Sequence, residues 1–90
     1  MGNRKIQWDT DAWNDYLSWQ TQDRKTLKRI NRLINEISRD PFHGSGKPEL
    51  LRNELAGFWS RRIDETNRIV YTADKDTVYI IACKDHYSSH

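Results

Sequence analysis

The stretch GFWSRRIDETNRIVY, residues 57–71, decides the fold because it contains two strand-like segments joined by a polar turn. Aromatic and β-branched residues favour strands at 57–63 and 68–73. Side chains alternate between the two faces of a strand. In the first segment one face would receive Phe58, Ser60 and Arg62, and the other Trp59, Arg61 and Ile63.

The arginines of this hairpin predict an anion site. A turn with an odd number of residues, such as 64–66, would place Arg62 directly opposite Arg68, whereas a four-residue turn, 64–67, would offset them. Like charges on opposite strands destabilise a sheet unless an anion lies between them. The alternative is solvation, or pairing with Asp64, Glu65 or Asp85. Arg61 points to the other face, where we expect it to contact solvent or a partner.

Two helices are predicted before the hairpin because apolar residues recur at helical spacing. The first follows the capping residues Asp9 and Thr10, and its apolar face would contain Trp13, Tyr16, Leu17 and Gln20, with Ala12 beside them. The second begins after a cap within 21–23 and ends near Arg39, because Asp40–Pro41 cannot continue a helix. Its apolar face would contain Leu27, Ile30, Leu33, Ile34 and Ile37. Trp8, Trp13, Tyr16, Trp59 and Tyr79 are expected mostly in the core.

Strands are also predicted at both ends of the chain. Residues 4–8 form a short opening strand, and the nearly continuous apolar run at 77–83 is typical of a strand covered on both faces. Residues 41–49 form an exposed loop, and 50–55 are ambiguous. The sequence therefore predicts one α+β domain over residues 1–90, with two N-terminal helices packed on a small antiparallel meander sheet.

Composition excludes several classes of protein. The chain has 90 residues and a single cysteine, which excludes an internal disulfide framework and a cysteine-based zinc cluster. Cys83 is expected to be a small buried hydrophobe. The absence of a long apolar run gives the expectation of a soluble, cytoplasmic protein.

Positive charge is concentrated in the middle of the chain. Residues 24–68 hold eleven Lys or Arg against six Asp or Glu, a bias that favours an anionic partner such as nucleic acid. One helical stripe contains Lys25, Lys28, Arg29 and Arg32. Such a stripe is either a solvated helix face or a binding surface.

Several polar residues together suit metal-free cleavage of RNA. The 2′-hydroxyl of RNA can attack the adjacent phosphate if a base takes its proton, an acid protonates the leaving oxygen, and cations stabilise the phosphorane. Candidates are Glu49, His86, Tyr87, Arg62 and Arg68. Each has a simpler interpretation, as a surface carboxylate, a polar tail or solvated cations. No cluster has the spacing of a metal site, and no cofactor is expected. His43 and His90 are not expected to be catalytic.

The chain resembles the YoeB (Txe) branch of the RelE/ParE toxin superfamily over nearly its whole length. The segments that carry the resemblance are WNDYLSWQ at 13–20, KRINRLI at 28–34, PFHGSGKPELL at 41–51, GFWSRRI at 57–63, NRIVY at 67–71 and ACKDHY at 82–87. This resemblance implies a RelE-like, microbial-RNase-type fold. It also implies the toxin of a type II toxin–antitoxin system, which cuts mRNA in the ribosomal A site.

Residue roles follow from the same resemblance. Glu49 corresponds to the general base and His86 to the general acid. Arg62 and Arg68 correspond to phosphate clamps, and Tyr87 to a residue that positions the base or scissile phosphate. Lys47 and Arg52 would hold the RNA backbone, and the helical stripe would meet ribosomal RNA.

Partners are implied as well: a YefM/Axe-type antitoxin with an acidic disordered tail, the 70S ribosome with its A-site mRNA, and a second copy of the chain. Two alternatives stay open. One is a non-enzymatic blocker of the A site, and the other is a ParE-like toxin that binds gyrase. A general RNA-binding domain is less favoured, because no signature of such a domain is present.

Overall fold

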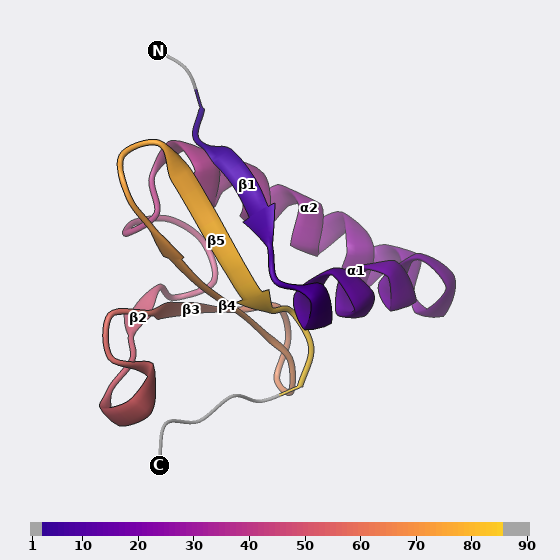
Figure 1. The fold of residues 1–90 in the computed structure, drawn as a ribbon. Coiled ribbons are helices and arrows are strands. Elements are labelled where there is room, and N and C mark those ends of the chain that lie inside the picture. The colour runs from indigo at the N-terminus through magenta and orange to yellow at the C-terminus, as the bar shows by residue number, and fades with distance from the viewer. Residues whose placement is uncertain (1–2, 86–90) are drawn as a thin grey trace.

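The computed structural model describes residues 3–85 and shows two helices packed against one face of a five-stranded sheet (Figure 1). In chain order the elements are β1 (Lys5–Trp8), α1 (Thr10–Gln22), α2 (Arg24–Arg39), β2 (Glu49–Leu50), the 3-10 helix η1 (Asn53–Leu55), β3 (Trp59–Arg62), β4 (Arg68–Ala73) and β5 (Thr77–Ala82). The predicted α+β class is confirmed. The ambiguous segment 50–55 contains the end of a two-residue strand and the short helix.

The strand order is β1-β5-β4-β3-β2. Strands β3 to β5 form the predicted antiparallel meander, and β2, which was not predicted, extends it beyond β3. The sheet as a whole is mixed, because β1 adds to its edge in parallel with β5. This addition places the most apolar strand in the interior of the sheet, where both of its edges are paired. Along β5 buried residues alternate with half-buried ones, so the helices cover one face more fully than the other.

Helix α1 forms where predicted, but its buried face is rotated from the predicted one, with Ala12 and Tyr16 common to both. Ala12 and Trp19 are buried, whereas Trp13 and Leu17 are 42% and 41% exposed. The indole N–H of Trp19 donates to the Cys83 carbonyl at 2.9 Å, which fixes the helix to the chain just after β5. The buried stripe therefore runs through residues 12 and 19, although the neighbouring stripe is also apolar.

Helix α2 agrees with the prediction. The Asp23 carboxylate caps it by accepting from the backbone N–H groups of Lys25 and Thr26. All five predicted apolar residues lie in or against the core: Ile30, Leu33 and Ile37 are buried, and Leu27 and Ile34 pack against them. The helix ends at Arg39, directly before Asp40–Pro41.

Of the two registers that the sequence leaves open, the β3–β4 hairpin has the one in which Arg62 is paired to Arg68. The Ile63 N–H donates to the Asn67 carbonyl at 2.9 Å and encloses the three-residue turn 64–66. The Asp64 carboxylate accepts from two backbone N–H groups of this turn. Within residues 3–85, no helix has the length and apolar content that a membrane span requires.

Candidate active site

The face of the sheet opposite the helices carries the candidate site. One row of paired residues crosses three strands on this face: Glu49, Ser60 and Val70. The next residues along β4, Ile69 and Tyr71, belong to the core beneath the helices, so strand alternation places this row on the opposite face. The pair formed by Arg62 and Arg68 is the next row on the same face.

The two arginines of this pair are close neighbours. The Arg62 N–H donates to the Gly46 carbonyl at 2.7 Å, and the Arg68 N–H donates to the Asp85 carbonyl at 3.0 Å. Because both N–H groups point away from the other strand, the arginines form a non-hydrogen-bonded pair, the type in which side chains approach most closely. Glu49 is paired with Ser60, so it is the diagonal neighbour of Arg62 on the same face. Diagonal neighbours in an antiparallel pair are about 7–8 Å apart. A carboxylate and two cations therefore share one small area.

The connection into β2 brings a further cation to this area. Lys47 is exposed and has a left-handed backbone with φ of 53°, two residues before Glu49. Arg52 is also exposed and precedes η1. Glu49 itself is exposed at the edge of the sheet. All three side chains can therefore be reached by a ligand as large as RNA.

The predicted basic stripe on α2 divides into two parts. Lys25, Lys28 and Arg32 are exposed. The Arg29 side chain is half-buried and donates to the carbonyls of Ile63 and Arg62, so it supports the β3–β4 turn. Sequence reasoning did not foresee this structural contact.

The chain after β5 is fixed to the candidate site. Asp85 has a left-handed backbone with φ of 65°, and its N–H donates to the Asn67 side-chain oxygen at 2.7 Å. Its carbonyl accepts from the Arg68 N–H. The predicted residues His86 and Tyr87 lie outside the described residues. The residue immediately before them is therefore held beside Arg68.

Arg61 corrects an expectation from the sequence, because it contacts neither solvent nor a partner but is 0% exposed. Its Nε donates to the Tyr71 hydroxyl at 3.0 Å. Its two terminal nitrogens donate to the Glu36 carboxylate and to three backbone carbonyls, those of Asp40, His43 and Ser45. The sequence contained a signal for this burial, since Arg61 shares a strand face with Trp59 and Ile63.

Glu36 is the anionic partner of this buried cation. The Ser45 backbone N–H donates to its carboxylate at 2.8 Å and holds the pKa of Glu36 below its usual value, and the Arg61 and Arg32 cations act in the same direction. The carboxylate therefore stays ionised at neutral pH. Among residues 3–85, no group of three or more His, Cys, Asp or Glu side chains is arranged to hold a metal ion.

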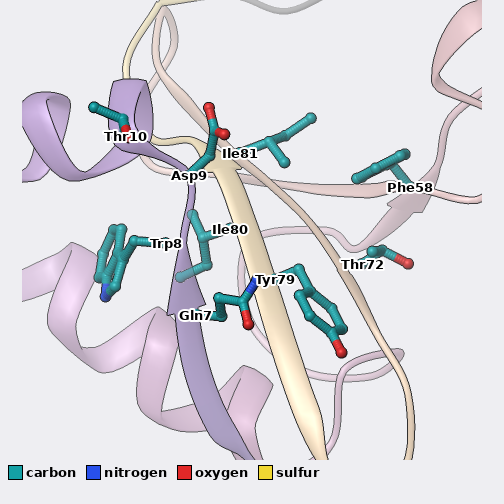
Figure 2. A pocket seen from close by; sticks show the side chains of 9 residues that line it. All are labelled: Gln7, Trp8, Asp9, Thr10, Phe58, Thr72, Tyr79, Ile80 and Ile81. Atoms are coloured by element: carbon teal, nitrogen blue, oxygen red, sulfur yellow. The ribbon is translucent and has the colours of Figure 1, made fainter.

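The open face also has a hollow of about 400 Å³ toward the β1 edge (Figure 2). Gln7, Thr72 and Tyr79 are paired across three strands and line its floor, and Phe58 lies at its β3 side. The Tyr79 hydroxyl donates to the Asp74 carboxylate at 3.0 Å, which keeps the ring in place. The hollow is mostly uncharged, in contrast to the cationic end of the same face.

Comparison with known proteins connects this arrangement to one family. The family model described as "YoeB-like toxin of bacterial type II toxin-antitoxin system" matches residues 8–87. The chain belongs to this YoeB-like toxin family. It is 55% identical over 84 residues to the toxin YoeB of Mycobacterium bovis, an alignment that covers 93% of this chain and 99% of that protein.

Solved structures of YoeB toxins agree with the fold. The YoeB dimer from Staphylococcus aureus has a TM-score of 0.88 and 40% identity, covering 96% of this chain and 100% of that chain. A heterotetrameric YoeB–YefM toxin–antitoxin complex from the same organism has a TM-score of 0.85, 40% identity and the same coverage. The chain is therefore a YoeB-type toxin with the fold of its relatives, and the resemblance inferred from the sequence is confirmed.

Proposed function

We propose that this chain is a ribosome-dependent mRNA endoribonuclease that cuts the message in the ribosomal A site and so stops translation. The observation that carries the proposal is the placement of Glu49 diagonal to Arg62, with Arg68 opposite Arg62 on the same open face. A base beside two cations is the combination that attack by a 2′-hydroxyl on a phosphate requires.

The proposed reaction needs no metal ion. Glu49 takes the proton of the 2′-hydroxyl as that oxygen attacks phosphorus. The bond from phosphorus to the 5′-oxygen breaks, and His86 gives its proton to that oxygen. The products are a 2′,3′-cyclic phosphate and a 5′-hydroxyl. Arg62 and Arg68 stabilise the charge that develops on the non-bridging oxygens.

Binding residues surround these groups. Lys47 and Arg52 flank Glu49 and would hold the RNA backbone, and Tyr87 would position the base or the scissile phosphate. The exposed cations Lys25, Lys28 and Arg32 would meet ribosomal RNA. Arg29 would contribute its charge from the turn that it supports. Contacts of these cations with phosphates would set the position of the RNA, whereas Glu49 and His86 would act on the scissile bond.

Two partners follow from the relatives. The complex of a YoeB with YefM in Staphylococcus aureus supports a YefM-type antitoxin as the partner of this chain. The cationic end of the open face suits an acidic segment of such a partner. The dimer of a YoeB from the same organism supports self-association. The site of action would be the cytoplasm, where the ribosomes are.

A primer-extension assay on mRNA in a reconstituted translation reaction tests the proposal. The parent, Glu49→Gln and His86→Ala are compared with and without ribosomes. The control is Asp76→Asn, which neutralises an exposed carboxylate in the β4–β5 turn, at the other end of β4 from Arg68. We expect ribosome-dependent cuts by the parent and the control, and losses of 10²-fold or more, as is typical of an acid or base, in the two test variants.

The alternatives give different results in the same assay. Arrest of translation without cuts, unchanged in His86→Ala, would replace the proposal with a blocker of the A site. No effect on translation would direct the search to gyrase.

A further inference from the structure

Arg61 is a cation that the proposed chemistry does not use, and its burial is complete. An arginine side chain has five N–H donors, and here Nε makes one hydrogen bond and the two terminal nitrogens make two each. Within residues 3–85, no buried side-chain nitrogen or oxygen lacks a hydrogen-bond partner. The guanidinium is therefore fully bonded on one side of β3, while its neighbour Arg62 is exposed on the other.

Three of the five acceptors belong to one loop. Arg61 donates to the carbonyls of Asp40 at 2.8 Å, His43 at 2.8 Å and Ser45 at 3.2 Å. These carbonyls belong to the segment between α2 and β2, which we call the 40–46 loop. The carbonyls of a loop without regular structure have few backbone N–H partners. The guanidinium therefore supplies the hydrogen-bond donors that a neighbouring strand or helical turn would otherwise provide.

The other two acceptors connect the loop to the rest of the protein. Glu36 comes from α2 and also accepts from the Ser45 N–H at 2.8 Å. Tyr71 comes from β4, and its hydroxyl donates to the Pro41 carbonyl at 2.6 Å. The loop is thereby held by a helix and by two strands at once.

Close packing completes this arrangement. A Cβ atom added to Gly44 would lie 2.6 Å from the Glu36 carboxylate and 2.8 Å from an Arg61 nitrogen. A Cβ added to Gly46 would lie 3.0 Å from the Arg62 carbonyl. Both glycines have positive φ, of 130° and 83°, which other residues adopt only with strain. The loop fits closely around the guanidinium, and a side chain at either position would force its neighbours to shift.

The loop leads directly into the candidate active site. The Gly46 carbonyl accepts from the Arg62 N–H at 2.7 Å, and Lys47 and Glu49 follow. Strand β2, which carries Glu49, has only two residues and lies at the edge of the sheet. Two ladder pairs cannot fix a strand by themselves, so the position of Glu49 depends on the segments that enter and leave it.

We propose that Arg61 is a positioning residue of the active site, which, together with Glu36 and Tyr71, holds the 40–46 loop so that Lys47 and Glu49 stand beside Arg62. The proposal rests on the proposed function for its catalytic consequence. Arg61 touches no substrate in this role. It affects the reaction by fixing the position of the general base, Glu49. A displacement of a catalytic group by about 1 Å lowers the rate by about 10²-fold.

The test uses Tyr71→Phe, because removing Arg61 itself endangers folding. This change deletes one hydroxyl, and with it the bonds to Arg61 Nε and the Pro41 carbonyl, while the ring remains in the core. The control is Val78→Ala, which removes buried apolar volume at the far end of β5 from the site row. Amide hydrogen exchange and single-turnover cleavage on ribosomes are measured for both variants and the parent.

We expect Tyr71→Phe to lower the exchange protection of the Arg62 amide at least 10-fold relative to amides of the β4–β5 ladder. We also expect it to lower the single-turnover rate constant about 10- to 100-fold. The ribosome concentration that gives half of the maximal rate should change by less than about 2-fold. Val78→Ala should lower protection throughout the sheet and leave the rate constant near that of the parent at a temperature where it is folded.

Unchanged local protection in Tyr71→Phe would overturn the proposal, as would lower protection with a rate constant equal to that of the parent. A parent that cuts no RNA would refute the proposed function instead. In that case the exchange data alone decide whether the buried cluster holds residues 46–49 in place.

Discussion

Replacing each of the two adjacent arginines of β3 by methionine should lower the free energy of unfolding strongly at Arg61 and hardly at all at Arg62. Arg61→Met removes a fully buried cation with five hydrogen bonds, and Arg62→Met removes an exposed cation that we place in the catalytic machinery. Methionine keeps much of the aliphatic volume of arginine in both cases. The pair therefore separates loss of polar contacts in the core from loss of charge at the site.

The magnitude for Arg61→Met follows from what the guanidinium leaves behind. Three backbone carbonyls, the Tyr71 hydroxyl and the Glu36 carboxylate each lose a donor. The Glu36 side chain is 30% exposed, so the cost comes mainly from the carbonyls and the hydroxyl. A buried acceptor that loses its donor costs about 1–3 kcal/mol, and two such losses give about 3–5 kcal/mol. A domain of this size has a free energy of unfolding of about 5–15 kcal/mol, so the loss is a large share of the total. At ~4–8 °C per kcal/mol the melting temperature should fall by roughly 10–40 °C.

Arg62→Met should change the free energy of unfolding by less than about 0.5 kcal/mol, as is usual for an exposed position. Urea unfolding followed by tryptophan fluorescence measures both variants, because Trp19 is buried and reports on the core. Cleavage on ribosomes is measured in parallel, and Arg62→Met should lose it while staying folded. Equal free energies of unfolding for the two variants would refute the assignment of Arg61 as the buried residue that holds the 40–46 loop. A decrease of less than about 1 kcal/mol in Arg61→Met would refute it as well.

Three further outcomes are expected. The Glu36 pKa is held below its usual value by the Ser45 N–H and by nearby cations, so the stability it contributes is present at neutral pH and is lost as pH falls through that lowered pKa. Melting temperatures between pH 6 and pH 3 should therefore fall less steeply in Glu36→Gln than in the parent, and parallel curves would contradict this. Burial, with the Asp15 carboxylate as a smaller cause, raises the pKa of Cys83 to about 12, so a thiol reagent at pH 8 should label the protein only after urea unfolds it. Sulfate at ten times its Kd for the Arg62–Arg68 pair should add about 1.4 kcal/mol to the free energy of unfolding, beyond sodium chloride at equal ionic strength. Thermal shift assays should show no such gain in Arg62→Gln.

The alternation of side chains along β3 and β4 predicted that Arg62 and Arg68 lie on strands of one hairpin. It left two turn lengths open, and the structure has the odd one between 63 and 67, which with the period of two places Arg62 opposite Arg68. Helical periodicity likewise predicted α2, whose apolar stripe is unambiguous. It predicted the buried face of α1 only in part, because two adjacent stripes are apolar and the buried one runs through Trp19, whose indole N–H donates to the Cys83 carbonyl.

The role of Arg61 could not be predicted in the same way, although its shared face with Trp59 and Ile63 indicated burial. Its acceptors are mostly backbone carbonyls of the 40–46 loop, and every residue type carries a carbonyl. Their convergence depends on loop conformation, which the two glycines permit but do not specify. For the same reason the two-residue strand β2 is not visible in the sequence, since its pairing depends on where that loop ends.

The opposite environments of Arg61 and Arg62 also specify the register of the sheet. A slip of β3 by one residue would exchange the two faces, placing Arg62 among the core residues and Arg61 on the open face. Ile63, which is buried, and Trp59, which packs against the core, would move to the open face together with Arg61. The slip is therefore opposed by the lost burial of these two residues and by the loss of the hydrogen bonds that Arg61 makes in the observed register. The residues that stabilise the core face of β3 thus also keep Arg62 on the open face, so stability and the proposed activity depend on the same choice of register.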